Sequence, residues 1–305
     1  MPASEPRYMG GQAVLEGVMM RGATTWAVAV RDRDGAIKVD VRDVPGWAER
    51  YRAIPVLRGV MSLGESLGLG YQALTWSANQ QVPADEQVSE KAMGWAVAVA
   101  AVVFSALFIV LPALAGRSFG HLFHGSFPVF EGLARLAIFV VYLLAVSRLR
   151  DIRRVFEYHG AEHKAIAAYE NGVELTPETA QQFSTAHVRC GTNFLLTVMV
   201  VAIVVYAVIP RPNLFAVIGS RLVLVPLIAG LSYEVIRLAA NHMQYKYVRA
   251  AMRPGLLLQR LTTRRPDLDQ LEVAIASLRA VMTADQLAEV DARAGLRTPA
   301  VAPAV

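Results

Sequence analysis

The stretch from Ala92 to Leu114, AMGWAVAVAAVVFSALFIVLPAL, decides the fold because it contains no charged residue. An α-helix rises about 1.5 Å per residue, so a helix of this length crosses the roughly 30 Å of hydrocarbon in a bilayer. The composition agrees, since 54% of the 305 residues are hydrophobic and only 18% are charged. We therefore predict a mainly α, polytopic membrane protein with about four transmembrane helices.

A second span is predicted from Val129 to Ser147, although this segment contains two charged residues. Glu131 and Arg135 are four positions apart, which places them on one face of a helix where they can form an ion pair. Charged residues inside spans usually pair in this way, so these two do not exclude a transmembrane helix.

Two further spans are predicted on either side of the turn Pro210-Arg211-Pro212. The third runs from Asn193 to Ile209 and the fourth from Val217 to Ile236. The fourth has only a short uncharged stretch, so it crosses the bilayer only if Arg221 and Glu234 lie near opposite interfaces or partly inside. A shallow hairpin that does not fully cross is the alternative for this pair.

The distribution of Lys and Arg predicts the orientation of the spans. Of the 30 basic residues, 26 lie before the first span, between the second and third, or after the fourth. By the positive-inside rule, both termini and the central loop face the cytosol, while His121 and His124 face outward. These loops explain the basic pI of 9.5, so the predicted partner is the lipid bilayer and no nucleic acid is required.

The spans divide the chain into six predicted segments. They are an N-terminal cytosolic region at residues 1–91, a first pair of spans at 92–147, a cytosolic loop at 148–192, a second pair of spans at 193–236, a C-terminal cytosolic helical region at 237–295, and a disordered tail at 296–305.

The N-terminal region is predicted to contain a small β-hairpin. Residues Trp26 to Arg31 and Ala36 to Val41 alternate apolar and polar side chains around the turn sequence Asp32-Arg33-Asp34-Gly35. The following segment, Ile54 to Ala78, is apolar and glycine-rich. It predicts an interfacial helix, with a fifth span as the alternative.

The C-terminal region contains an apolar stripe with the spacing of an amphipathic helix. Its members are Leu268, Leu271, Ile275, Leu278 and Met282. A helix over residues 268–282 therefore offers an apolar face either to a protein partner or to the rest of the chain. Thr283 and Gln286 form a predicted capping box for a short last helix that ends at Gly295.

The central loop carries the residues best suited to chemistry, because it contains the H-x-x-E-H spacing of inverted zinc proteases. On a helix, His159 and His163 are one turn apart and can hold one divalent metal ion, for which Zn²⁺ is the first candidate. Glu162 lies off that axis, where it can accept the proton of a water molecule as a general base. The alternative is that both histidines only cap or pair within a basic interfacial helix.

A metal centre needs at least one more ligand, and three residues on the predicted cytosolic side are candidates. We rank Glu234, at the end of the fourth span, and His187 above Cys190. Glu234 has an alternative role as a carboxylate paired with Arg237 at the interface. For Cys190, the alternative is a buried structural thiol.

Several motifs follow one another along the chain: Gly10-Gly-Gln-Ala-Val-Leu-Glu-Gly-Val-Met-Met-Arg-Gly22, Tyr158-His-Gly-Ala-Glu-His-Lys164, Arg189-Cys-Gly-Thr192, Ser232-Tyr-Glu234, Pro254-Gly-Leu and Leu261-Thr-Thr-Arg264. Together they resemble the YqhQ-like family of bacterial membrane proteins, which has no established function and is sometimes labelled as predicted metal-dependent enzymes. The resemblance implies a plasma-membrane location and a shared pattern that includes His159, Glu162, His163, His187, Cys190 and Glu234. It supplies no reaction.

The segment from Gly10 to Gly22 has no strong helix or strand period. Its glycines would let the backbone approach a ligand or the membrane-facing site. A loop packed under the β-hairpin is the alternative.

Two functions remain open from the sequence. The first is a membrane-bound metal-dependent hydrolase that uses the H-x-x-E-H residues. The second is a non-catalytic scaffold or assembly factor with a structural metal or none. A transporter is disfavoured, because the spans carry few charges and show no repeat or paired broken helices.

Overall fold

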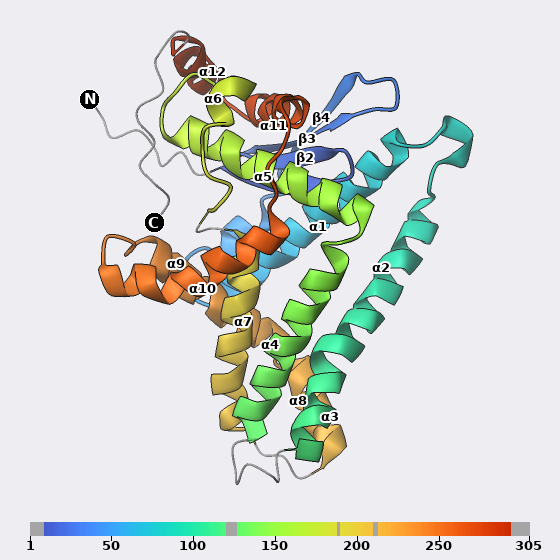
Figure 1. Cartoon of the computed structure of the whole chain (residues 1–305), viewed down its shortest axis with the longest axis vertical. Coiled ribbons are helices and arrows are strands. Elements are labelled where there is room, and N and C mark those ends of the chain that lie inside the picture. Colours follow the sequence, from blue (N-terminus) through green and yellow to red (C-terminus); the bar gives the residue numbers. More distant parts are fainter. Residues whose placement is uncertain (1–8, 120–126, 188–189, 210–212, 294–305) are drawn as a thin grey trace.

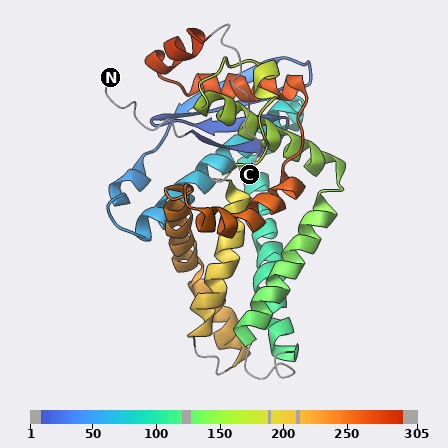
Figure 2. The ribbon, with the colours of Figure 1, turned by 60° about the vertical axis from the view of Figure 1, so that its left-hand side comes forward.

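The computed structural model describes residues 9–119, 127–187, 190–209 and 213–293. A small β-sheet and its covering helices form one end of the molecule, and a bundle of long helices forms the other (Figures 1 and 2). The predicted outer-side histidines His121 and His124, the turn at 210–212 and the tail at 296–305 lie outside the described residues.

The sheet has four antiparallel strands in the order β1-β2-β3-β4. The strands are β1 (Gly10–Val14), β2 (Gly17–Arg21), β3 (Thr25–Arg31) and β4 (Ile37–Asp43). The predicted hairpin is confirmed as β3 and β4. The absence of a strand period in the Gly10 to Gly22 segment was misleading, since this segment forms β1 and β2. Its glycines hide the alternation, yet Gly17 is needed because a Cβ atom there would lie 2.1 Å from the Ala29 carbonyl oxygen.

Helices cover both faces of the sheet. On one face, α5 (Arg150–Glu170) and α11 (Leu268–Ala280) form the main core with β2 and β3. On the other face, α1 (Leu57–Gln80) packs Leu69 and Ala73 against β-strand residues that include the buried Trp26. In Figure 1, α1 lies between the sheet and the bundle, together with α9 (Val225–Ala240) and α10 (Lys246–Thr262).

The C-terminal stripe belongs to the chain's own core. Leu271, Ile275, Leu278 and Met282 are buried in the main cluster, whereas Leu268 is exposed. The apolar face of α11 is therefore used internally, which is the second of the two predicted alternatives. The capping box at Thr283 is confirmed, and it starts α12 (Ala284–Asp291), which ends before the predicted boundary at Gly295. The short helix α6 (Pro177–Ala180) completes this end of the molecule.

In the part of the chain that the structure describes, two helices are long and apolar enough to cross a membrane, or three if a bent pair counts as one span. The first runs from Glu90 to Ser118 through α2 (Glu90–Ser105), a π-helical turn η3 (Ala106–Val110) and most of α3 (Leu111–Phe119). The second is α4 (Phe127–Val146). The predicted third span corresponds to α7 (Gly191–Ala207), which with 17 residues is shorter than the usual roughly 20.

The predicted fourth span is broken rather than straight. It consists of α8 (Leu214–Val223) and α9, which meet at Leu224 with a bend of 48°. The position of Arg221 relative to the bilayer interfaces stays a prediction, but its side chain is completely buried inside the bundle. The physical reason is that α4 supplies a buried carboxylate for it.

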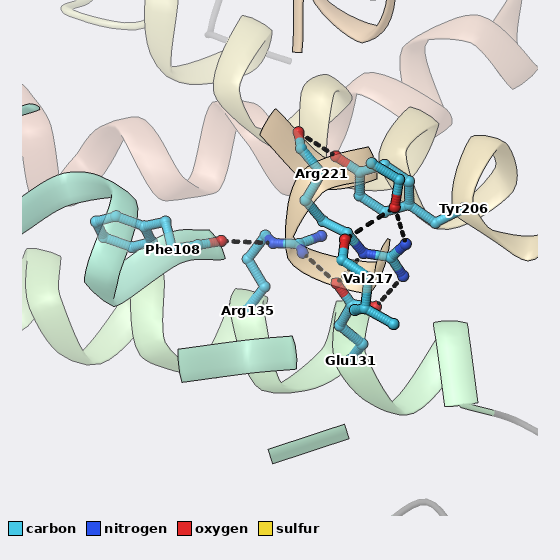
Figure 3. A network of polar contacts seen from close by, with 7 residues as sticks. Phe108, Glu131, Arg135, Tyr206, Val217 and Arg221 are labelled. Carbon is cyan, nitrogen blue, oxygen red and sulfur yellow. Dashed lines mark hydrogen bonds and ion pairs between the residues drawn. The ribbon is translucent and has the colours of Figure 1, made fainter. Parts of the chain in front are cut away.

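Figure 3 shows this buried ionic cluster. Glu131 accepts hydrogen bonds from Arg221 at 2.5 and 3.1 Å and from Arg135 at 2.7 Å, so the predicted Glu131–Arg135 pair is confirmed. Arg135 also donates to the carbonyl oxygen of Phe108 in the π-helical turn at 2.8 Å. The Arg221 guanidinium stacks 4.1 Å from the centre of the Tyr206 ring. The cluster thus joins α4, η3, α7 and α8.

We expect Glu131→Gln to destabilise the bundle by about 3 kcal/mol, because both arginines would then be buried without a carboxylate. The melting temperature of detergent-purified protein measures this loss. Glu49→Gln is the matched control, since Glu49 forms only an exposed pair with Arg52, and it should leave the melting temperature unchanged. Equal melting temperatures for the two variants would contradict a structural role for the cluster.

Candidate functional site

The middle of α5 carries the H-x-x-E-H residues and is the most deeply buried part of that helix. Its first turns are basic and exposed, whereas almost every side chain from Tyr158 to Tyr169 is buried against the sheet or α11. The motif is therefore placed where the sheet end of the molecule meets the bundle.

A glycine inside the motif allows a second segment to approach the helix. A Cβ atom on Gly160 would lie 1.9 Å from the carbonyl oxygen of Arg264. The amide of Arg264 in turn donates to the Phe156 carbonyl at 2.9 Å. This close approach brings the end of α10 alongside α5 and positions the Thr262 carbonyl beside His159.

His159, His163 and Cys190 converge, and their ligand atoms lie within 4.8 Å of one another. Each histidine donates its Nδ1 hydrogen to a backbone carbonyl, His159 to Thr262 and His163 to Thr185. The Nε2 atom of His159 is then left with a lone pair 3.4 Å from the Cys190 sulfur. Burial lowers the pKa of His163, which favours the neutral imidazole that metal coordination requires.

Glu162 is buried beside this cluster and lacks a full set of partners. Within the described residues, its Oε2 atom has no hydrogen-bond partner. The backbone amide of Gly11 in β1 interacts with the carboxylate. Burial raises the pKa of Glu162, so this side chain binds a proton more readily than an exposed glutamate.

The four residues line one cavity of about 740 Å³. Its polar wall also includes His187, and its remaining walls come from β1, from the end of α4, from the first and middle turns of α5, and from the start of α7. Most of these remaining walls are apolar. A cavity of this volume, with a few convergent polar groups, matches the usual size of a small-ligand or substrate site.

The structure separates the predicted ligands into two groups. His187 lies near the cluster, with its ring 5.6 Å from that of His163, but its Nε2 atom is 3.6 Å from Glu170. Glu234 is not with the histidines. It accepts hydrogen bonds from Arg58 at 2.7 Å and from the Val56 amide at 3.1 Å. The two histidines thus have Cys190 as their neighbour rather than Glu234, and which residue completes a metal centre stays a prediction.

Sequence reasoning missed the backbone groups that orient the site. These are the amide of Gly11 and the carbonyls of Thr185 and Thr262. The glycines of the Gly10 to Gly22 segment were the available signal for the first, and the backbone does approach Glu162 there. No pattern of side chains marks a carbonyl, so the other two were not accessible from the sequence.

The described parts define an α-helical protein with spans apolar enough for a membrane and a His–His–Cys cluster under a small sheet. The chain belongs to the family described as "Protein of unknown function (DUF1385)", whose model matches residues 54–284. It is also 32% identical over 303 residues to "Uncharacterized protein YqhQ" of Bacillus subtilis (strain 168), covering 93% of this chain and 95% of that relative. The predicted resemblance is therefore confirmed. No solved structure matches.

We expect Gly160→Ala to lower stability by about 1–3 kcal/mol, because the added methyl group forces the Arg264 carbonyl away from α5. Thermal unfolding in detergent measures the effect. Gly94→Ala is the control, since a Cβ atom at this helical position has nothing within 4 Å. A Gly160→Ala protein as stable as the Gly94→Ala protein would show that the close approach is dispensable.

Proposed function

We propose that this protein is a membrane-bound metal-dependent hydrolase whose site opens near the cytosolic membrane surface. The single observation that carries the proposal is the convergence of His159, His163 and Cys190 on a cavity that also holds the unsatisfied carboxylate of Glu162. Buried polar groups are almost always satisfied, so an exception that faces a cavity calls for a functional explanation.

The membrane location rests on the outer surface of the bundle. Large apolar side chains are exposed there, including Val102 at 68%, Val141 at 65% and Val204 at 66%. A soluble protein rarely exposes so many in one region. In the proposed orientation the basic sheet end faces the cytosol, as the distribution of Lys and Arg predicts, and the plasma membrane is the proposed location.

The donor set fits a divalent transition metal. Two imidazole nitrogens and one thiolate suit Zn²⁺ better than Mg²⁺ or Ca²⁺, which prefer oxygen ligands. The Thr185 and Thr262 carbonyls would hold each ring with Nε2 toward the ion, an arrangement typical of metal-binding histidines. Bound Zn²⁺ supplies Lewis acidity and makes water acidic enough to lose a proton near neutral pH.

Glu162 is the proposed general base. It would accept the proton of the attacking water and deliver it to the leaving group as the scissile bond breaks. Gly11 would hold the carboxylate in place through its backbone amide. Glu162 and His163 are themselves buried, and low local polarity strengthens the electrostatic effect of each of these groups.

A second candidate is a cysteine hydrolase, and the position of Cys190 favours it. This residue is the N-cap of α7, its sulfur accepts a hydrogen bond from the Thr192 amide, and His159 is within reach as a base. Helix N-termini and neighbouring histidines both stabilise thiolates. Metal analysis separates the two candidates.

We expect the purified wild-type protein to contain about one zinc ion per chain by elemental analysis. His163→Ala and Cys190→Ala should lose the metal, whereas Glu162→Gln should keep it and fail to complement a deletion strain. Glu234→Gln is the matched control, since this carboxylate lies outside the cluster, and it should keep the metal.

Each other outcome has a definite meaning. Wild-type protein without stoichiometric metal would overturn the metalloenzyme, and inactivation of that protein by alkylation of Cys190 would favour the cysteine hydrolase. A Glu162→Gln protein that binds metal and complements the deletion would indicate a structural site, and therefore the scaffold alternative.

The proposed topology predicts opposite labelling at two exposed positions in a Cys190→Ser background. Ser118→Cys, at the far end of the first candidate span, should react with a membrane-impermeant maleimide in intact cells. Gln182→Cys, in the segment between α6 and α7, should react only after the membrane is permeabilised. Labelling of both positions in intact cells would contradict this orientation.

A further inference from the structure

The strand β1 is an edge of the sheet, and it forms one wall of the candidate active site. Residues 9–13 line the same cavity as Glu162 and His163. Among the described residues, only β2 pairs with β1, so half of the main-chain groups of β1 turn away from the sheet.

The pairing register identifies these outward groups. Glu16 accepts a hydrogen bond from Arg31 and Gly22 donates one to Thr25, so the even-numbered residues of this strand region turn toward β3. The odd-numbered residues of β2 therefore turn toward β1, where they pair with Gly10, Gln12 and Val14. Gly11 and Ala13 consequently direct their amides and carbonyls away from β2.

One of the outward groups already has a role, since the Gly11 amide faces Glu162. Among the described residues, no hydrogen bond is made to the Gly11 carbonyl, the Ala13 amide or the Ala13 carbonyl. These three groups alternate along the strand as acceptor, donor and acceptor. An extended polypeptide offers the complementary pattern at the usual strand spacing of about 4.8 Å.

We propose that the substrate is a polypeptide segment with apolar side chains, bound in extended form as an additional strand on β1. This inference rests on the proposed hydrolase function and names its substrate class. Strand addition would place the peptide backbone beside Glu162. The reason is that Gly11 lies on the edge strand β1 and its amide, which points outward from the sheet, interacts with the Glu162 carboxylate.

The rest of the cavity fits side chains of such a segment. Tyr142, Leu143 and Val146 contribute from the last turns of α4, and Leu195 contributes from α7. Since α4 is a candidate span, these residues lie in the proposed orientation at its cytosolic end, where a peptide leaving the bilayer would first meet the protein. A lipid acyl chain would satisfy the apolar walls, but it has no amide or carbonyl groups for the edge of β1.

The reaction is hydrolysis of a peptide bond with water as the second reactant. The oxygen of water bonds to the carbonyl carbon and the C–N bond breaks. Glu162 transfers one proton from the water to the departing nitrogen, which leaves as the amine, and the other product is a carboxylic acid that ionises in solution. No oxidant or reductant is required.

The test uses Ala13→Pro in the full-length, metal-loaded protein. Proline removes the outward Ala13 amide without removing a β1–β2 hydrogen bond. The probes are internally quenched decapeptides of Ala, Val, Leu and Phe, and a short-chain phosphatidylglycerol. We expect cleavage of the peptides by wild type, no cleavage by Glu162→Gln, and a roughly tenfold lower kcat/KM for Ala13→Pro.

A matched proline lies on the opposite edge of the sheet. Val41 in β4 also has an outward amide by register, is exposed and is remote from the cavity, so Val41→Pro should cleave the peptides like wild type. Melting temperature and metal content of both variants verify that each folds. Equal kcat/KM for Ala13→Pro and Val41→Pro would overturn strand addition.

The remaining outcomes separate this inference from the hydrolase proposal. Hydrolysis of the lipid without the peptides would retain the hydrolase and overturn the peptide substrate. If no probe is hydrolysed but fluorescent decapeptides bind to wild type and bind about tenfold more weakly to Ala13→Pro, peptide binding on β1 is supported while hydrolysis fails. Absence of both cleavage and binding of the peptides would overturn the inference.

Discussion

The burial of the middle of α5 is the constraint on which the candidate site depends. Tyr158, Ala161 and Ala165 face the core that α5 shares with the sheet and α11, so the helix cannot rotate without exposing them. That fixed rotation directs His159 and His163 toward α7 and α10, and it turns Glu162 toward β1. Burying polar groups at this position is costly, and the carbonyls of Thr185 and Thr262 offset the cost for the histidines alone.

The bundle also buries a charged side chain, and it balances that charge with an ion pair and an aromatic ring. Arg221 is completely buried, and its charge is balanced by Glu131 on α4 and by the face of the Tyr206 ring. The pair joins α8 to α4 across 90 positions of sequence. α8 and α9 are bent relative to each other by 48°. The ionic cluster thus fixes α8 on one side of the bend while Arg58 holds Glu234 on the other.

Much of this organisation was predictable from local patterns, and the exceptions share one cause. Apolar runs predicted α2, α4 and α7, the stripe from Leu268 to Met282 predicted α11, and the spacing of Thr283 and Gln286 predicted a capping box. What the sequence did not reveal are partners far apart along the chain. Arg221 pairs with Glu131 and Glu234 pairs with Arg58, at separations of 90 and 176 residues. The sequence favours Glu234 and His187 over Cys190 because a lone cysteine is more often a buried structural thiol, and the approach of Cys190 to both histidines is created by the fold.

The same distinction explains how much of the site the sequence could define. The H-x-x-E-H spacing was sufficient to bring two histidines and a glutamate onto one turn of helix, whatever the rest of the fold. Its surroundings depend on contacts that only folding creates. Gly11 is an example of such a contact, because the backbone can approach Glu162 there only in the absence of a side chain. A Cβ atom there would lie 2.5 Å from the Met19 carbonyl and 3.1 Å from Glu162. A strand edge and a buried carboxylate can share one cavity only where such a residue removes the steric conflict between them.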